Sequence, residues 1–334
     1  MSRVYINDSS SQIGISDNCL QIKTKDGVTK NVPVETVEGI SVFGQAQISS
    51  QCIGECLRRG INIQYYSPSG LYFGRLSSSN HVNTFRQKRQ VFLSDNEDFK
   101  LVISKKIIEA KIKNQITVLR RYARNTTIDI NANLKSMQSC CNRLDICNEI
   151  DEIMGYEGNA ARIYYETLSS LSPPVFQFKK RTRRPPLDPF NSMLSFGYAI
   201  LLNEVFGALE SKGLNPFFGF LHADREKHPT LASDLMEEWR AVIVDSVVMS
   251  LIRGNEIEYD NFRESDDGPG IFIDRDGIKT IIKKLENKFM TKSSYLDYID
   301  YQVSFRRAIE LQAGQLAKAI EEENPNIYLP VVIR

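Results

Sequence analysis

The stretch FKLVISKKIIEAKIKNQITVLRRYAR, residues 99–124, decides the fold prediction. Its apolar residues recur at intervals of three and four, which is the period of an amphipathic helix. Segments with a strand-like pattern become rare from this stretch to the end of the chain. The sequence therefore predicts that the larger part of the chain, from residue 87 onward, is an all-α domain.

The residues before this helix have a different composition. Short segments rich in Val, Ile and Tyr are separated by Asp, Asn and Gly, which is typical of strands and turns. The Lys-Asp-Gly sequence at residues 25–27 lies between two alternating segments and predicts a hairpin. One helix is expected among these strands, with Ser49 or Ser50 as its N-cap and Gly60 at its end.

A polar stretch, SSSNHVN at residues 77–83, separates the two patterns. We therefore predict an α+β chain, in which an N-terminal mainly-β domain (residues 1–77) and a linker (78–86) precede a C-terminal all-α domain (87–334). A proline-rich segment at 170–190 and an acidic segment at 255–276 interrupt the helical pattern. The last residues, NPNIYLPVVIR, are predicted to form an extended C-terminal arm.

The bulk composition is that of a globular protein. Of the 334 residues, 42% are hydrophobic and 25% are charged. No stretch approaches the roughly 18 apolar residues of a membrane span, and the N-terminus lacks the pattern of a secretory signal. We expect a cytoplasmic protein without a membrane partner. Its six cysteines have no disulfide-framework spacing and form no C-x-x-C pair, so we expect free thiols rather than a zinc ribbon.

The net charge of +1 conceals two segments of opposite charge. Residues 75–135 hold thirteen Lys or Arg and five Asp or Glu, whereas residues 255–276 hold eight acids and two bases. The basic segment suits a polyanionic partner, although a solvated helix face has the same composition. The acidic segment has no role that the sequence defines.

The richest cluster of reactive side chains lies in GFLHADREKHPTLASDLMEEW, residues 219–239. His222 lies in a polar loop before a predicted helix that carries Asp234, Glu237 and Glu238. Acids three and four residues apart share one face of a helix and repel each other unless a cation lies nearby. That cation is either a divalent metal ion or Arg240. Imidazole nitrogen together with carboxylate oxygens suits manganese or magnesium better than a thiolate-seeking metal.

A further carboxylate stands out in MGYEGNAARIYY, where small residues surround Glu157 on a predicted helix. Gly155 and Gly158 each cost about 1 kcal/mol of helix stability relative to Ala. We interpret them as room for the close approach of another helix, which lets Glu157 reach inward. Each of these residues also has an ordinary interpretation, as a surface histidine or a solvated acid.

Several motifs together resemble the CRISPR-associated integrase family. They are GYEGNAAR around Glu157, NPFFGFLH ending at His222, and DLMEEWR at residues 234–240. RRPPLDPFNSMLSFGYAILL is similar to the central helical segment of that family, and VEGISVFGQAQIS, ECLRRGINI and GLYFGRL are similar to its N-terminal β domain. The resemblance covers nearly the whole chain and is weakest at residues 90–145 and in the acidic segment.

The resemblance implies a metal-dependent endonuclease that inserts new spacers into CRISPR arrays. It implies a homodimer, two of which are bridged by a small ferredoxin-like CRISPR-associated adaptation partner. It also implies a Mn²⁺ or Mg²⁺ site formed by Glu157, His222 and Glu237, with Asp234 as an accessory acid. Because the last ligand varies between Asp and Glu in such proteins, Asp234 and Glu238 remain alternatives to Glu237.

The expected substrates are the spacer donor duplex and the CRISPR repeat. A basic loop between the Glu157 and His222 motifs is predicted to contact target phosphates, and it contains Lys179, Lys180, Arg181, Arg183 and Arg184. Arg86 and Arg89 of the basic segment are predicted to support donor DNA. Two alternatives stay open: a metal-dependent nuclease that does not join strands, and a non-catalytic DNA-binding scaffold.

Overall fold

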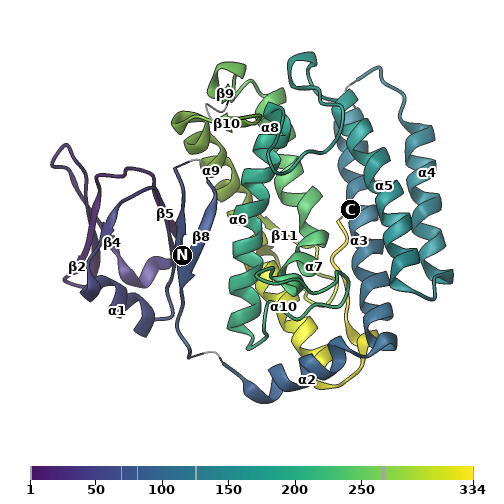
Figure 1. Cartoon of the computed structure of the whole chain (residues 1–334), viewed down its shortest axis with the longest axis horizontal. Coiled ribbons are helices and arrows are strands. Elements are labelled where there is room, and N and C mark those ends of the chain that lie inside the picture. The colour runs from purple at the N-terminus through teal and green to yellow at the C-terminus, as the bar shows by residue number, and fades with distance from the viewer. Residues whose placement is uncertain (1, 69, 81, 125, 265–267, 334) are drawn as a thin grey trace. The chain divides into compact units, whose positions relative to one another are not determined.

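The computed structural model describes residues 2–68, 70–80, 82–124, 126–264 and 268–333 (Figure 1). It separates into two compact units. The first comprises residues 1–81 and 273–279, and the second comprises 82–272 and 280–334. The boundary falls inside the predicted linker, of which residue 81 lies outside the described residues. Residues 273–279, which the sequence analysis placed in the helical domain, group with the first unit because they pack there.

The first unit contains two four-stranded sheets. In one the strand order is β1-β5-β7-β8, with only the β7–β8 pair antiparallel, and in the other it is β4-β3-β2-β6. The strands are β1 (Ser2–Ile6), β2 (Gln12–Ser16), β3 (Cys19–Lys23), β4 (Thr29–Pro33), β5 (Val37–Phe43), β6 (Gln47–Ile48), β7 (Asn62–Tyr66) and β8 (Tyr72–Leu76). The mainly-β prediction is confirmed.

Local signals predicted two details of this unit correctly. Strands β3 and β4 pair antiparallel as the expected hairpin, and Gly27 in their turn has φ +76°, a conformation that favours glycine. Helix α1 (Ser50–Arg58) begins after Ser49, whose side chain accepts a hydrogen bond from the Cys52 N–H. Its buried side packs with residues of both sheets in one core cluster.

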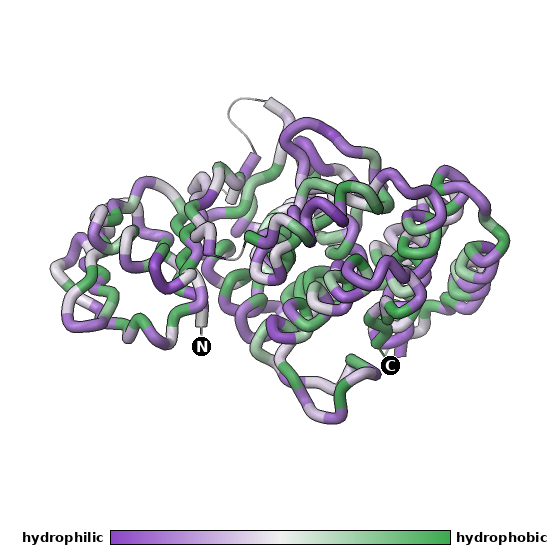
Figure 2. Tube along the Cα trace, turned by 90° about the horizontal axis from the view of Figure 1, so that it is seen from below, coloured by the Kyte–Doolittle hydropathy of each residue, from purple (hydrophilic) through white to green (hydrophobic). Residues whose placement is uncertain are grey.

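The second unit is mainly helical, and green and purple alternate within its helices in Figure 2, as expected of helices that bury one side. Helices α3, α4 and α5 lie side by side, and α6 and α7 also pack together (Figure 1). The helices are α2 (Thr84–Ser94), α3 (Glu97–Ala123), α4 (Asn131–Arg143), α5 (Ile150–Ser170), α6 (Pro189–Ser211), α7 (Thr230–Trp239), α8 (Ser246–Arg253), α9 (Arg275–Met290) and α10 (Phe305–Glu321).

Two short strand pairs correct the expectation of an all-α second domain. They are β9 (Phe262–Glu264) with β10 (Ile271–Ile273), and β11 (Lys292–Ser293) with β12 (Val303–Ser304). The first pair forms within the acidic segment, whose residues 265–267 lie outside the described residues. These ribbons are too short to give the alternating pattern that predicts a strand from sequence.

Helix α6 corrects a second expectation. By length and composition it is apolar enough to cross a membrane, although the sequence analysis found no such segment. Ser, Asn and Gly interrupt its apolar residues, so the sequence shows no long uninterrupted apolar run although the mean hydropathy of the helix is high. Within the structure 72% of its apolar window is buried, as in the core helix of a globular domain.

Candidate active site

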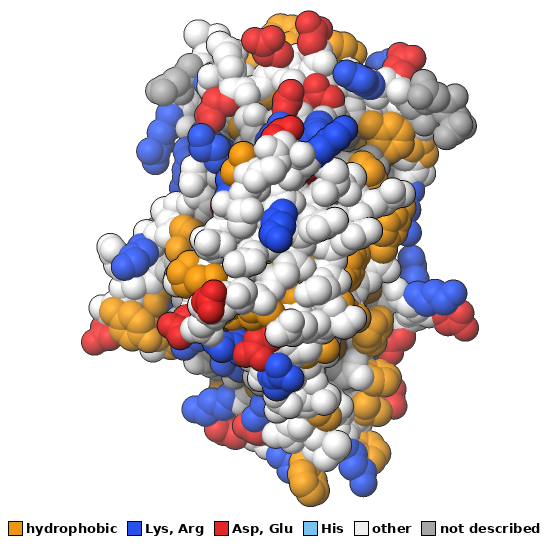
Figure 3. Space-filling view, turned by 90° about the vertical axis from the view of Figure 1, so that its left-hand side faces the viewer, with side chains coloured by type: hydrophobic (Ala, Val, Ile, Leu, Met, Phe, Trp, Pro, Cys, Tyr) orange, Lys and Arg blue, Asp and Glu red, His pale blue; other side chains and the backbone are white. Residues whose placement is uncertain are grey.

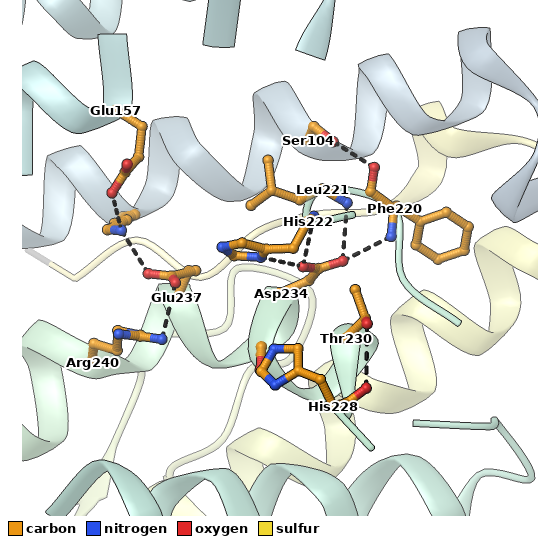
Figure 4. Close-up of polar contacts among 12 residues, drawn as sticks. Ser104, Glu157, Phe220, Leu221, His222, His228, Thr230, Asp234, Glu237 and Arg240 are labelled. Atoms are coloured by element: carbon orange, nitrogen blue, oxygen red, sulfur yellow. Dashed lines mark hydrogen bonds and ion pairs between the residues drawn. The ribbon is translucent and has the colours of Figure 1, made fainter. Parts of the chain in front are cut away.

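Asp234 of helix α7 organises the loop that carries His222. Its carboxylate accepts hydrogen bonds from the backbone N–H groups of Phe220 (2.7 Å), Leu221 (3.0 Å) and His222 (3.2 Å) (Figure 4). A Cβ on Gly219 would lie 2.6 Å from an Asp234 carboxylate oxygen, so the loop approaches α7 this closely only with glycine at that position. This role of Gly219 was not predicted from the sequence, although its place between Phe218 and Phe220 was a usable signal.

The same carboxylate fixes the His222 ring. Asp234 Oδ1 lies 2.6 Å from His222 Nδ1, which leaves Nε2 as the nitrogen that faces away from this bond. Burial lowers the pKa of His222, but the hydrogen bond and charge of Asp234 outweigh it, and the net pKa is raised. Asp234 therefore holds both the loop and the His222 ring, and its role as an accessory acid stays a prediction.

Glu157 of α5 and Glu237 of α7 meet at one cationic group, the ammonium of Lys111 on α3. Lys111 Nζ lies 2.7 Å from Glu237 Oε2 and also pairs with Glu157 Oε1. Lys111 was missed by the sequence analysis, because one lysine among many in a basic helix gives no signal. The structure thus brings the two predicted acids together, with a lysine between them.

Charge decides the ionisation of these buried groups. Burial raises the pKa of Glu237, but Arg240, whose Nη2 lies 3.1 Å from Glu237 Oε1, and Lys111 outweigh it and lower that pKa to about 2. His222 also lowers the pKa of Glu237, and Glu237 in turn raises that of His222, so these two predicted ligands act on each other. Burial lowers the pKa of Lys111, whereas Glu237 and Glu157 more than reverse this and raise it.

Glu238, the neighbouring acid on α7, lies in a separate environment. It is fully buried, and its carboxylate accepts hydrogen bonds from Tyr328 Oη (2.5 Å), Gln312 Nε2 (3.1 Å) and the Val331 N–H (2.9 Å). Burial raises its pKa to about 8. Glu238 therefore holds the C-terminal arm that the sequence predicted as extended. Three residues of this arm, Tyr328, Val331 and Ile333, are buried.

A cavity of about 360 Å³ adjoins Glu157. Its lining combines helix α5 with the predicted basic loop and consists of Glu157, Gly158, Ala161, Arg162, Tyr165, Glu166, Lys179, Lys180, Arg181 and Arg183. This corrects the interpretation of the glycines: a Cβ on Gly155 or Gly158 would meet nothing within 4 Å, so neither glycine makes room for a neighbouring helix. Gly158 instead forms part of the cavity wall.

Comparison with known proteins identifies the family. The family model described as "CRISPR associated protein Cas1" matches residues 4–287. This chain belongs to the Cas1 family. It is 34% identical over 333 residues to a protein named "CRISPR-associated endonuclease Cas1" from Mycobacterium tuberculosis. The matched region covers 100% of this chain and 98% of that protein. The family model and this relative together place the chain among the CRISPR-associated Cas1 proteins, whose curated members are named endonucleases.

Solved structures share the Cas1 fold. A chain of a "Cas6-RT-Cas1--Cas2 complex" matches with a TM-score of 0.84 and 24% identity, over 100% of this chain and 36% of that one. A casposase bound to integration product matches with a TM-score of 0.84 and 22% identity, over 97% and 92% of the two chains. At these identities the likeness establishes the β-then-α architecture alone.

The basic loop of this Cas1 chain contains two kinds of residue. Arg181 is half-buried, donates to Asn191 Oδ1 (2.9 Å) and Ser195 Oγ (3.1 Å), and stacks on Tyr198. The other four predicted DNA contacts are exposed, and no described carboxylate forms an ion pair with any of them: Lys179, Lys180, Arg183 and Arg184. These four are the ones with charges available to phosphates.

Arg86 and Arg89 receive a different role in the structure. Both hold α2 against the end of α10, where Arg86 pairs with Glu321 and Arg89 lies 3.1 Å from Glu323. Arg86 also donates to the Lys212 carbonyl. Their contact with donor DNA stays a prediction, and it loses support because these guanidinium groups already have partners within the chain.

Arg240 is fixed by the element that follows α7. Residues Arg240–Asp245 form one π-helical turn, an irregularity frequent at functional sites. Arg240 stacks on the Tyr198 ring at 4.9 Å. Tyr198 donates to Asp245 Oδ1 (2.5 Å), and Tyr164 donates to the other oxygen, Asp245 Oδ2 (2.7 Å). Burial raises the pKa of Asp245 to about 6. Arg240 is therefore held rigidly beside Glu237.

Proposed function

We propose that this Cas1 chain is a divalent-metal-dependent DNA integrase and endonuclease of CRISPR adaptation. It would join the 3′-hydroxyl ends of new spacer DNA to the CRISPR repeat by phosphodiester transesterification. The observation that carries the proposal is the convergence of Glu157 and Glu237 on one cation, with His222 held beside them by Asp234. Family membership supports endonuclease chemistry at this cluster.

The residues fit a Mn²⁺ or Mg²⁺ ion. Glu157 Oε1, Glu237 Oε2 and His222 Nε2 would supply a mixed oxygen and nitrogen donor set, which such ions accept. Among the described residues no three His, Cys, Asp or Glu side chains already lie as an ion would need them. The Lys111 ammonium lies between the two carboxylates. That two carboxylates already share one cation supports the fit. The bound ion would neutralise charge on the phosphate and polarise phosphorus for attack.

The chain's own residues would prepare the reaction. Asp234 would keep the His222 ring in the tautomer whose Nε2 carries the lone pair, as partners of metal-bound histidines do. Arg240 would hold the Glu237 carboxylate in a fixed orientation. The chain needs no covalent intermediate, because phosphoryl transfer depends mainly on positioning and charge neutralisation.

The four exposed cations of the basic loop would bind DNA phosphates, and three of them, Lys179, Lys180 and Arg183, line the cavity beside Glu157. The face turned to the viewer in Figure 3 supports this choice by contrast, since Lys and Arg are interspersed there with Asp and Glu. Replacing Lys179, Lys180, Arg183 and Arg184 by Ala should weaken duplex binding and reduce the slope of log affinity against log salt by about 3.6, at about 0.9 for each phosphate contact. The variant with Lys279, Lys283 and Lys318 replaced by Ala is the control, and equal slopes would refute the contact.

Homodimerisation and the small ferredoxin-like adaptation partner belong to the same proposal. The solved complex whose name joins Cas1 to Cas2 supports the partner, whereas the homodimer rests on the family resemblance. Light scattering of the pure protein measures its mass in solution. A homodimer should have twice the mass of the 38.1 kDa chain. Addition of the partner should then give a larger complex with higher joining activity.

A strand-transfer assay tests the function. Short duplexes with free 3′-hydroxyl ends are mixed with supercoiled plasmid carrying a CRISPR repeat, in Mn²⁺, with and without the partner. Joined products should form with wild type and disappear with Glu157→Ala, His222→Ala and Glu237→Ala. Cleavage without joining would support the nuclease alternative. DNA binding without any metal-dependent product would support the scaffold and reject the proposal.

A further inference from the structure

Lys111 has a position that the proposed function does not explain. It lies on α3, is 8% exposed, and directs its ammonium between Glu157 and Glu237. A buried lysine is unfavourable unless anions compensate its charge, and here two carboxylates do so. Its Nζ therefore serves as the resident cation of the acidic pair.

Lys111 and a metal ion would need the same space. Nζ lies 2.7 Å from Glu237 Oε2, and an ion shared by the two carboxylates would lie about 2.1 Å from an oxygen of each. Ammonium and ion cannot both fit between Glu157 and Glu237. Entry of the ion therefore requires Lys111 to move, which its flexible four-carbon side chain allows.

The second cation at the site cannot move in this way. Arg240 contacts the other oxygen of Glu237 and is held by stacking on Tyr198. When Lys111 leaves, Glu157 and Glu237 face both the ion and Arg240, and the displaced ammonium has lost its two anions. The site then holds an excess of positive charge, which a DNA phosphate would neutralise.

We propose that Lys111 is a counter-cation that excludes the divalent ion until a DNA phosphate binds, so that metal binding and DNA binding are coupled. This inference rests on the proposed metal site. It specifies that the ion binds weakly to the free protein and tightly to the DNA complex. Because such coupling is reciprocal, the ion strengthens DNA binding by the same factor.

Trp239 provides a direct readout of metal binding. It is the only tryptophan, is fully buried, and lies two residues from Glu237. Paramagnetic Mn²⁺ bound at the site should quench its fluorescence. Mn²⁺ titrations of the full-length chain, with and without a short duplex, then compare wild type with Lys111→Met. Lys113→Met is the matched control, since Lys113 lies on the same helix, is more exposed and pairs with Glu109.

The duplex should tighten Mn²⁺ binding to wild type and Lys113→Met by about tenfold. Lys111→Met should bind Mn²⁺ about tenfold more tightly than wild type without DNA, and the duplex should change its affinity less than twofold. Lys111→Met should also melt at a lower temperature in EDTA and recover in Mn²⁺, because its carboxylates lack a counter-cation. Mn²⁺ affinity equal to or weaker than that of wild type in Lys111→Met would overturn the proposal.

Two further variants separate the possible failures. Lys111→Gln keeps hydrogen-bond donors beside the carboxylates without the charge, and it repeats the comparison if Lys111→Met does not fold. Glu157→Gln should abolish saturable quenching. If Mn²⁺ quenches Glu157→Gln as it does wild type, the proposed metal site itself is wrong. If Glu157→Gln loses quenching while Lys111 variants behave as wild type, only the role of Lys111 fails.

Discussion

The two sides of helix α7 carry adjacent buried glutamates whose pKa values are shifted in opposite directions. Glu237 faces Lys111 and Arg240, and these cations outweigh burial and lower its pKa to about 2. Glu238 faces the C-terminal arm, where burial outweighs neutral hydrogen-bond donors and raises its pKa to about 8. Burial alone therefore does not identify a catalytic acid, and the charge of the partners distinguishes the two residues.

The two sides also differ in the segment that each one holds. Toward the proposed metal site, Asp234 holds the loop of His222. On the other side, Glu238 holds the arm, and Asn114 of α3 strengthens this contact by donating to the Glu238 and Val331 carbonyls, both at 2.9 Å. We infer that one side of α7 performs chemistry and the other fixes the helix in place.

The largest expected effect on stability comes from the arm side. Glu238→Ala leaves the buried Tyr328 hydroxyl and Val331 N–H without their acceptor. At about 1–3 kcal/mol for each such group, the free energy of unfolding should fall by roughly 3 kcal/mol or more in urea denaturation. Glu310→Ala, which removes a half-buried acid paired with the exposed Arg307, is the control and should cost less than about 1 kcal/mol. Equal losses would contradict the anchoring role.

Asp234→Asn should act on activity more than on stability. The amide keeps one acceptor oxygen for the loop, but it no longer holds His222 Nδ1 by charge. Loss of such a partner of a metal ligand typically costs about 10–100-fold, which strand-transfer rates at saturating Mn²⁺ would show. Asp145→Asn, at an exposed position, should keep the wild-type rate. An unchanged rate in Asp234→Asn would mean that this side of α7 does not position the ligand.

The pH dependence of stability separates the two glutamates. The pKa of Glu238 is raised from 4.5 to about 8, so the folded protein retains a proton that the unfolded chain has lost. This contribution is fully present below pH 4.5 and is lost as the pH rises through 8, with a slope of at most about 1.4 kcal/mol per pH unit.

Glu238→Gln mimics the protonated acid and should therefore flatten the decline of melting temperature between these pH values. Other titrating groups stay the same in both proteins, so the difference between the two curves isolates Glu238. Parallel curves would show that its carboxyl is already ionised at low pH in the folded state.

The smallest effect is expected from a single hydroxyl on the arm. Tyr328→Phe removes one donor to Glu238 and leaves the buried ring in place. Its free energy of unfolding should fall by about 1 kcal/mol. Tyr301→Phe, at a residue that is 56% exposed, should be neutral. If Tyr328→Phe lowered the free energy of unfolding as much as Glu238→Ala does, the Tyr328 hydroxyl alone would hold the arm to Glu238.

Sequence patterns predicted the parts of this molecule that depend on local chemistry. The β-to-α change of fold, the hairpin at Gly27 and the cap at Ser49 follow from turn and helix signals that act within a few residues. Likewise, His222 and Asp234 lie close in sequence, and the structure joins them directly.

Contacts between distant segments could not be predicted in this way. Lys111 lies 46 residues before Glu157 and reaches it only because α3 and α5 pack together. The arm meets Glu238 across 90 residues, and no periodic pattern marks a buried glutamate that accepts from Tyr328. Residue type also failed to separate Glu237 from Glu238, because their different partners come from other elements.

The most direct test of this account compares Glu237→Gln with Glu238→Gln in one Mn²⁺-dependent strand-transfer assay. Both substitutions remove one carboxylate from adjacent positions of α7 and keep the side-chain size. We expect Glu237→Gln to lose joining by at least about 10³-fold, in the range of residues that stabilise transition-state charge, and Glu238→Gln to keep joining within about threefold. Equal losses in both, or loss only in Glu238→Gln, would contradict the assignment of chemistry to the Glu237 side.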